Sequence, residues 1–476
     1  SGEEETGGED GAGGEGGEDD WDAFFEEDAS EGGDGATAEE GTEGEALGWA
    51  ESVWGWLREN VHGKVGYKNL SHFSTGPFHD LRKTRHELRL ELEYRDWLLR
   101  SDDGAYGLKL VLGADVRVDD DDYAVGVLRS LDDEERRRPI LTTGENTLTL
   151  ALDWFELRGG WQIVSWGTGD LFNPTNNLNP VDFSDLFDPR RIPVLALTAA
   201  ADFELFSLEV HSIPSFTRSR VVLKGKRFDE LRTSPVPILR PDDPEANVEN
   251  VQWAARASTS VAGWDFSVSG FHGFNDFPQP RFVLLDPTNP ASLAVDPVFE
   301  RIDVLGADFA TTLGIFGAEG RLGEVLGGIQ VHGEIAHFWN ESEFADDYAQ
   351  YVVGFNYQFV DLIGEHDVTV VLEYAGEFVT AATDNVLDEV QVDRALRSAF
   401  LGRIVYAVDE DLSFELNAAL VTHGPENALI HPGVTYSVTD NVEAQLSGDI
   451  FLGPKDTFFG RYRKDGRVII EVRLLF

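Results

Sequence analysis

Long segments in which apolar and polar residues strictly alternate restrict the fold of this chain more than any other feature. Residues 468–476 place an apolar side chain at every second position, with Glu471 and Arg473 between them, and residues 412–420 and 87–95 repeat the pattern. Such stretches run for about nine to thirteen residues, whereas strands of soluble sandwiches average five or six. A tilted strand of this length crosses a bilayer, so the pattern predicts transmembrane strands with one apolar and one polar face.

The lengths of the connections give an independent test of a barrel. Short joins are expected near 158–160, 201–203, 262–263, 409–411 and 439–440, and long joins near 119–145, 168–191, 214–249, 273–298, 379–394 and 453–466. Long and short joins mostly alternate, as they do in outer-membrane barrels, which have an even number of antiparallel strands. We therefore predict an all-β transmembrane barrel over residues 64–476, in the outer membrane of a Gram-negative bacterium. The strand count closes at eighteen, or at sixteen if weak segments around 64–73 and 303–340 contribute fewer strands.

Composition excludes several other classes of protein. Acidic residues number 87 against 38 basic ones, for a net charge of −49, so no nucleic-acid partner is expected. The absence of cysteine excludes disulfides, thiolate metal sites and thiol catalysis. No apolar run reaches the roughly 18 to 20 residues that a membrane-spanning helix requires. The absence of methionine predicts that Ser1 arose by removal of a signal peptide, although an artificial chain boundary would look the same.

Residues 1–46 form an acidic segment with little to bury. The first fifty residues hold 19 Asp and Glu but no Lys or Arg, a composition that predicts a disordered periplasmic tail. Trp21, Phe24 and Phe25 interrupt this tail. We interpret them either as a docking motif for a periplasmic or inner-membrane transporter or as part of a solvated spacer.

Residues 47–63 are predicted to form one amphipathic, Trp-rich helix. Trp49, Val53, Trp56 and Leu57 recur at the spacing of a single helical face. Because tryptophan favours the boundary between hydrocarbon and water, this helix could lie on the membrane surface. It could equally pack inside or beneath the barrel.

The most distinctive motif of the chain lies within residues 159–185. A predicted strand ends in Ser165-Trp166-Gly167, and the following loop carries Asn177, Leu178, Asn179, Pro180, Val181 and Asp182. The segment resembles an uncharacterised family of bacterial outer-membrane β-barrel proteins, in which a strand ending in SWG leads to a loop carrying NxLNPVD. This resemblance implies a barrel often encoded beside inner-membrane lipid exporters of the resistance–nodulation–division type. The acidic amino-terminal extension departs from the family pattern.

The loop that carries this motif is predicted to leave the barrel wall. Asn173-Pro174 and Asn179-Pro180 fix turns, and their prolines remove the N–H donors that a strand would need. If the loop folds into the mouth, it forms a constriction that places six charged residues near the pore axis, namely Asp170, Asp182, Asp185, Asp188, Arg190 and Arg191. Opposed charges of this kind select solutes by charge. Alternatively, the loop packs and latches strands, and its acids and arginines pair with one another.

Alternation also assigns charged residues to the inner wall of the barrel, because a charge that faces lipid at mid-depth costs roughly 2–4 kcal/mol. The predicted lumen residues are Glu87, Arg89, Glu91, Glu93, Arg95, Lys109, Asp115, Arg117, Asp153, Glu373, Glu415, Glu471 and Arg473. Acids outnumber bases in this set, which favours cations modestly. The alternative role for these residues is a set of Glu–Arg ladders that rigidify the wall.

Sequence signals for chemistry are weak. The run Asp119-Asp120-Asp121-Asp122 is a weak calcium candidate, since it lacks the Gly and distal Glu of known calcium loops and such runs are usually solvated. Adjacent His211 and Ser212 would point to opposite faces of a strand, which excludes a direct lipase dyad, and His272 has no nucleophile near it. We expect no enzymatic activity, no cofactor and no other metal site.

Taken together, these features predict a porin-like outer-membrane channel for small polar or amphipathic solutes, surrounded by outer-membrane lipids. The alternative function is a docking component, whose barrel anchors a trans-envelope assembly with a possible role in lipid export. The acidic tail would bind the partner in that case.

Overall fold

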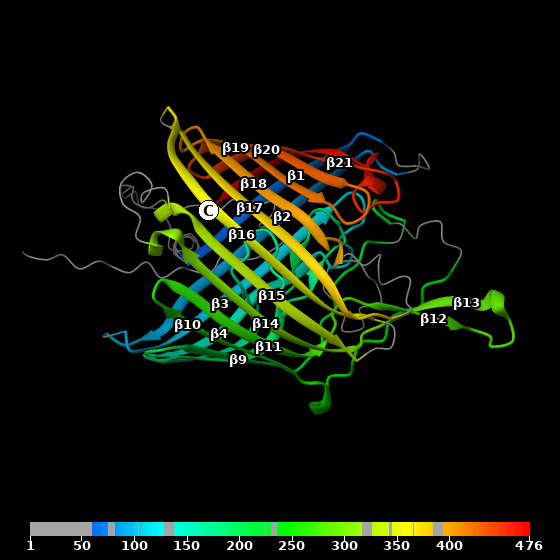
Figure 1. The fold of residues 1–476 in the computed structure, drawn as a ribbon, viewed down its shortest axis with the longest axis horizontal. Coiled ribbons are helices and arrows are strands. Elements are labelled where there is room, and N and C mark those ends of the chain that lie inside the picture. Colours follow the sequence, from blue (N-terminus) through cyan, green and yellow to red (C-terminus); the bar gives the residue numbers. More distant parts are fainter. Residues whose placement is uncertain are drawn as a thin grey trace, which may run out of the picture.

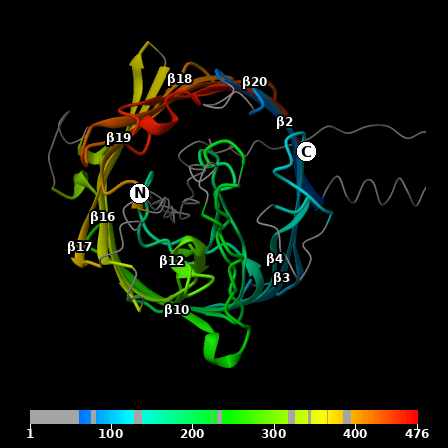
Figure 2. The same cartoon turned by 90° about the vertical axis from the view of Figure 1, so that its right-hand side faces the viewer.

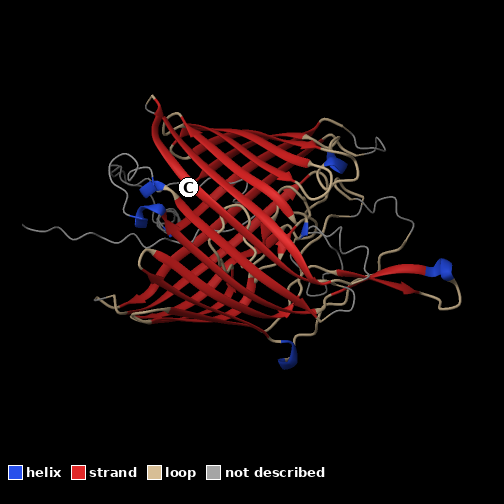
Figure 3. Ribbon diagram, in the orientation of Figure 1, coloured by secondary structure: helices blue, strands red, loops and turns tan. Residues whose placement is uncertain are grey.

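Eighteen strands of the chain pair into one closed antiparallel sheet, which confirms the predicted barrel. The computed structural model describes residues 60–74, 81–102, 104–127, 138–223, 225–229, 236–316, 326–341, 345–364, 366–383 and 394–476. Strand β22 (Arg467–Leu475) pairs with β1 (Val61–His72), and β1 pairs with β2 (Thr84–Arg100), so the sheet has no free edge. The strands are tilted around a common axis (Figures 1 and 3).

The remaining barrel strands follow one another around the wall in chain order. They are β3 (Tyr106–Asp119), β4 (Leu141–Leu152), β5 (Phe155–Gln162), β8 (Val194–Asp202), β9 (Ser207–Ile213), β10 (Gln252–Val261), β11 (Trp264–Phe274), β14 (Arg301–Thr312), β15 (Gln330–Asn340), β16 (Asp347–Ile363), β17 (His366–Ala381), β18 (Ser398–Ala407), β19 (Leu412–Val421), β20 (Asn427–Thr439) and β21 (Val442–Leu452).

Short elements occupy the connections between barrel strands. Two hairpins pair β6 (Val181–Asp182) with β7 (Arg190–Arg191) and β12 (Gln279–Leu284) with β13 (Leu293–Val298). Single 3-10 turns form η1 (Val248–Asn250), η2 (Pro290–Ser292), η3 (Leu313–Phe316) and η6 (Gly460–Tyr462). In the described residues, no helix has the length and apolarity needed to span a membrane.

The wall presents its apolar face outward, the reverse of a soluble sandwich. On β22, Ile470, Val472 and Leu474 are 47%, 41% and 44% exposed, whereas Glu471 and Arg473 between them are buried. The same alternation puts exposed leucines and aromatic residues on the outside of most barrel strands. A closed sheet with an apolar exterior and charges inside is the architecture of outer-membrane barrels, because every backbone group is paired within the wall.

The long joins lie at one end of the barrel, as predicted, and β1 begins and β22 ends at the other. Residues 120–140, 163–193, 214–251, 275–300, 382–397 and 453–466 connect strands at the long-loop end. The β12–β13 hairpin projects beyond the barrel there (Figure 1). At the short-turn end, residues 153–154, 262–263, 364–365 and 440–441 each link two strands. One connection departs from the pattern, because residues 313–329 join β14 to β15 at the short-turn end.

Two predicted boundaries were wrong. The join expected near 158–160 lies inside β5, because the real turn is Asp153-Trp154, across which Leu152 pairs with Phe155. Glycine is needed at position 160 for close approach: an added Cβ would lie 2.0 Å from the Asn146 carbonyl oxygen of β4. The strand β1 begins at Val61, so the last three residues of the predicted helix 47–63 are in a strand.

The other predictions for the amino-terminal part of the chain lie outside the described residues. They concern the acidic tail 1–46, the docking residues Trp21, Phe24 and Phe25, and the helix-face residues Trp49, Val53, Trp56 and Leu57.

Chain segments fill part of the barrel interior, as the view from the long-loop end shows (Figure 2). A buried cluster joins Phe183 and Phe187 from the 163–193 connection to Phe451 on β21 and to Phe459 and Tyr462. A second cluster joins Val164, Trp166 and Leu178 to inward residues of β8 to β16, among them Ala196, Ile213 and Val304. These clusters place the 163–193 connection inside the barrel.

Candidate functional site

Residues 163–193, here called the lumen loop, fold into the barrel rather than over it. Strands β5 and β8 are neighbours, and Gln162 pairs with Val194, so the loop leaves and re-enters the wall at one place. Between these points its residues bind two other parts of the wall, one on β15–β17 and one on β22–β2. The loop therefore crosses the lumen.

The first attachment consists of two buried carboxylates that accept hydrogen bonds from the backbone of the loop. Glu334 on β15 accepts from the N–H groups of Thr168, Gly169 (2.6 Å) and Thr175 (3.1 Å), and from the Thr175 hydroxyl at 2.9 Å. Glycine at position 167 is required here, because its φ is +102° and an added Cβ would lie 2.4 Å from a Glu334 oxygen. This glycine is the last residue of the SWG motif.

Glu373 on β17 binds the next three residues of the loop in the same way. It accepts from the N–H groups of Asp170 at 2.6 Å, Leu171 at 3.1 Å and Phe172 at 3.0 Å. Its side chain is fully buried. Backbone N–H groups of the loop surround both carboxyl groups, so the two glutamates and the loop form one hydrogen-bonded network.

The second attachment consists of ion pairs with β22, β1 and β2. Asp185 lies 2.8 Å from Arg467 and 3.0 Å from Arg85, and Asp188 lies 3.0 Å from Lys68. Burial opposes ionisation of both aspartates, but Arg467 and Lys68 outweigh it and lower the pKa of each. Both therefore carry their charge at neutral pH.

The loop also binds the neighbouring 214–251 connection. Asp182 accepts from Arg220 at 2.8 Å, and the Val181 N–H donates to Ser219, whose hydroxyl donates to Asp276 at 2.9 Å. Although burial favours the neutral acid, Arg220 and Arg138 lower the pKa of Asp182 to about 2. At Asp276, burial prevails and raises the pKa to about 6.

The six residues predicted to form a constriction are distributed over these attachments and do not form one ring. Asp170 keeps 35% of its side chain exposed, whereas Asp182, Asp185, Asp188 and Arg190 keep 6 to 14%. Arg190 lies 3.7 Å from Asp188, and Arg191 donates to the Asn176 carbonyl at 3.4 Å. In this geometry the loop acids pair mainly with basic residues outside the loop, and Asp188 also lies near Arg190 of the loop.

Most of the predicted lumen residues do point inward. Glu87, Arg117, Glu373, Glu415, Glu471 and Arg473 are buried, and Arg89, Glu91, Lys109 and Asp115 are half-buried, whereas Glu93 and Arg95 lie toward the short-turn end with side chains 41% and 51% exposed. Several pair across strands, such as Arg117 with Glu87 at 3.1 Å and Arg89 with Asp115 at 3.2 Å. Asp153 was wrongly placed, because it lies in the turn between β4 and β5 and is exposed.

The candidates for metal binding and catalysis separate in the structure. The carboxylates of the 119–122 run do not converge, because Asp119 accepts from the backbone of Tyr123 and Ala124, Asp120 pairs with Arg82, and Asp121 pairs with Lys226. The run therefore stays the weak calcium candidate that the sequence made it, and its carboxylates have separate partners in this structure. Within the described ranges, one group of three residues could hold a metal ion: Asp170, His332 and Glu373.

The histidines considered for catalysis have other partners. His211 is buried inside the barrel, 2.8 Å from the Thr198 hydroxyl and 3.1 Å from Glu209, while Ser212 is the next residue of the same strand and points to the opposite face. His272 lies 2.7 Å from Asp303 on the outside of the wall.

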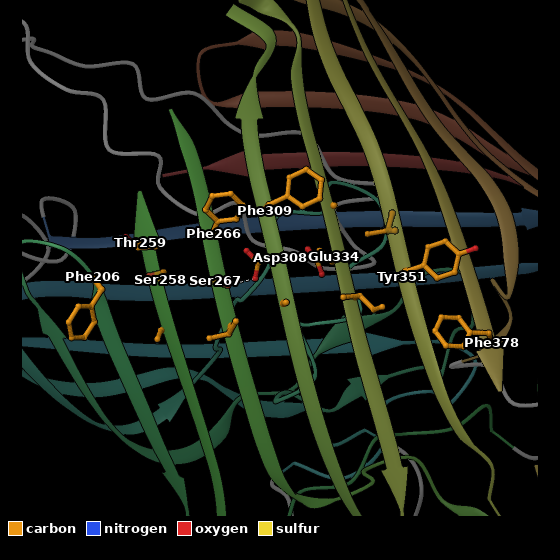
Figure 4. Close-up of a pocket in the computed structure, with 16 residues that line it drawn as sticks. Phe206, Ser258, Thr259, Phe266, Ser267, Asp308, Phe309, Glu334, Tyr351 and Phe378 are labelled. Atoms are coloured by element: carbon orange, nitrogen blue, oxygen red, sulfur yellow. Dashed lines mark hydrogen bonds between the residues drawn. The ribbon is translucent and has the colours of Figure 1, made fainter. Parts of the chain in front are cut away.

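An apolar groove of about 770 Å³ lies on the outer, lipid-facing side of β10–β17 (Figure 4). Phe266, Phe309, Tyr351 and Phe378 rim it, and Gly333 lies in its floor, where an added Cβ would approach the Phe309 ring to 2.7 Å. Glu334, the residue after Gly333, points to the opposite side of the wall. The groove is thus outside the pore.

Closed antiparallel pairing, an apolar exterior and a charged interior crossed by a loop define a porin-like barrel of the outer membrane. Residues 151–400, more than half of the chain, match the family described as "Protein of unknown function (DUF1302)", so the chain belongs to that family. The matched range contains the whole lumen loop. No curated protein matches the chain.

Among solved structures, the barrel is similar to outer-membrane protein OpdK from Pseudomonas aeruginosa. The two are 10% identical, the match covers 88% of this chain and 99% of OpdK, and the TM-score is 0.45. OpdP (OccD3) from the same organism is 11% identical over 88% of this chain and 91% of its own, with a TM-score of 0.44. A mutant porin of Rh. blastica is 13% identical, the match covers 88% of this chain and 99% of that porin, and the TM-score is 0.38.

Apart from Glu373, sequence reasoning missed the wall residues that hold the lumen loop. Glu334 and His332 lie in a segment that showed only a weak strand pattern, and Lys68, Arg85 and Arg467 were not singled out. Their inward position follows from strand parity once the register is known. The alternation along each strand could have shown that they point inward, but not that a loop distant in the sequence binds them.

Proposed function

We propose that this protein is a gated outer-membrane channel for small polar or amphipathic solutes, with the lumen loop as its gate. The observation that carries the proposal is that one loop crosses the lumen and binds the wall on both sides through side chains that point inward. A latch made of hydrogen bonds and ion pairs can release without unfolding the barrel, because the strand ladder does not depend on it. Passage would involve no chemistry.

The lining of the lumen supports both polar and amphipathic solutes. Charged pairs such as Arg117–Glu87 and Arg473–Glu471 line β22–β3, and charged groups inside a barrel retain water. The aromatic cluster around Phe187 and Phe451 lies within the same barrel. A released loop would uncover both kinds of surface, which suits a solute with one polar and one apolar part.

The register of β5 and β8 makes a direct test feasible. Because Gln162 pairs with Val194, residues 163–193 can be replaced by a two-residue Asn-Gly hairpin turn without disturbing either strand. In planar bilayers we expect the wild-type channel to conduct poorly and the shortened protein to conduct strongly, with a changed ion preference. If conductance and ion preference are the same in both folded proteins, the loop is not the gate. If neither conducts, the channel itself is refuted.

The dense burial of the lumen loop also favours a second candidate function, a closed barrel that anchors a trans-envelope assembly. The resemblance to barrels encoded beside resistance–nodulation–division exporters supports this alternative, with the acidic residues 1–46 as the segment that binds the partner. An anchor predicts no conductance in any variant. It also predicts that deletion of residues 1–46 abolishes recovery of an inner-membrane transporter with the barrel after cross-linking.

A further inference from the structure

His332 stands at the point where the lumen loop meets the wall. It lies on β15 and is almost fully buried, with Nε2 2.8 Å from an oxygen of Glu373. The other ring nitrogen, Nδ1, faces the Asp170 carboxylate of the loop at 3.8 Å, which is beyond hydrogen-bonding distance. Asn356 on β16 donates to the same Asp170 oxygen at 2.9 Å. Three strands and the loop therefore meet around the His332–Asp170 pair.

We propose that His332 and Asp170 bind a divalent transition-metal ion of the zinc class, which bridges the wall and the lumen loop. Zinc binds imidazole nitrogen at about 2.0–2.1 Å and carboxylate oxygen at about 2.0–2.2 Å, so an ion between Nδ1 and Oδ2 fits their separation with a bent angle. The exposed part of Asp170 lets water complete the coordination. An imidazole ligand favours zinc, nickel, cobalt or copper over calcium and magnesium, which take oxygen ligands.

Glu373 supports the site without binding the ion. Each of its oxygens accepts at least one backbone N–H group of residues 170–172, which leaves it poorly placed as a ligand. Its contact with Nε2 instead fixes the orientation of the ring and directs the Nδ1 lone pair toward Asp170. A carboxylate behind a metal-binding histidine commonly has this role, and it raises the basicity of the ligand.

Two other pairs of a histidine and an acid in the described part of the chain do not offer the same geometry. In His431–Asp449 and His272–Asp303 the ring nitrogen and the oxygen are 2.7 Å apart, the distance of a direct hydrogen bond that leaves no room for an ion. His332 differs because a second carboxylate, from another segment of the chain, faces its free nitrogen. The bridging position also has a consequence, which rests on the proposed function: a bound ion would hold the gate closed.

Binding can be measured separately from conductance. The full chain, folded in detergent with excess Mg²⁺ to occupy the acidic tail, would be titrated with Zn²⁺ by calorimetry and with Co²⁺ by visible absorption. We expect one site in the wild type and a loss of affinity of tenfold or more in His332→Gln and in Asp170→Asn. His272→Gln, which removes an outward histidine beside an acid, is the matched control and should bind like the wild type. Asp170 is partly exposed, so its variant tests the site even if His332→Gln folds poorly.

Equal Zn²⁺ affinity and Co²⁺ spectra in wild type and Asp170→Asn would overturn the proposed site, as would the absence of binding to the wild type. In bilayers, Zn²⁺ should lower the open probability of the wild type but not that of Asp170→Asn. Binding without this effect would overturn the gating consequence and leave the site standing. A protein that binds Zn²⁺ but never conducts would contradict the channel and not the metal site.

Discussion

Removal of the Glu334 carboxylate is the sharpest test of the latch, because all four hydrogen bonds of this side chain go to the lumen loop. In Glu334→Ala, three backbone N–H groups lose their acceptor. Each unsatisfied buried donor costs about 1–3 kcal/mol. Water that enters the vacated space recovers part of this loss, so we take the low end for each donor, about 3 kcal/mol in total. Since 1.4 kcal/mol is a factor of ten, the ratio of detached to attached loop should rise by roughly 150-fold.

The assay is the open probability of single channels in planar bilayers, together with circular dichroism to show that the barrel is intact. Glu415→Ala is the matched control: Glu415 is also a buried, inward glutamate, but it pairs with Arg403 and Asn417 on neighbouring parts of the wall. We expect Glu334→Ala to be open far more often than wild type and Glu415→Ala to behave like wild type. An equal rise in both variants would show that any lost wall carboxylate loosens the barrel. No rise in Glu334→Ala would refute the latch.

Two further perturbations act on other contacts of the lumen loop. Asp185→Asn leaves Arg85 and Arg467 without their shared carboxylate, and breaking a buried ion pair costs about 3–5 kcal/mol. The open probability should therefore rise, and the urea midpoint of the detergent-folded protein should fall. An unchanged midpoint would mean that water replaces the ion pair. Burial raises the pKa of Asp276 to about 6, so its stabilising contribution is complete below its ordinary pKa and is lost as the pH rises to about 6. Measured by thermal unfolding, the free energy of unfolding of Asp276→Asn should therefore rise relative to that of the wild type, by about 2 kcal/mol, between pH 4 and 7. A constant difference in stability between the two proteins over that range would contradict the raised pKa of Asp276.

The wall was predictable from the sequence and the lumen contacts were not, for physical reasons. Lipid outside and charge inside impose a period of two on every strand, and that local pattern identified residues as far apart as Glu87 and Arg473 as inward. The departure of the loop from the wall followed from Pro174 and Pro180, because proline has no backbone N–H to donate to a neighbouring strand. Its destination depended on partners such as Glu373 and Arg467, about two hundred residues or more further along the chain, and no local pattern encodes such a pairing. The pair Gly159-Gly160 was wrongly predicted as a turn, because glycine is required at position 160 by the close approach of the neighbouring strand β4.

Whether the two attachments release together decides how the gate opens. They use different chemistry and share no partner, so independent release would give two conductance levels and additive effects of Glu334→Ala and Asp185→Asn. However, Leu171, which donates to Glu373, and Phe187, whose carbonyl accepts from Arg467, belong to one buried cluster. Detaching one attachment exposes apolar surface that it shares with the other attachment. We therefore expect one open conductance level, and an effect of the double variant on open probability that is smaller than the sum of the two single effects. Two discrete levels, each favoured by a different single variant, would show that the aromatic cluster does not couple the ends.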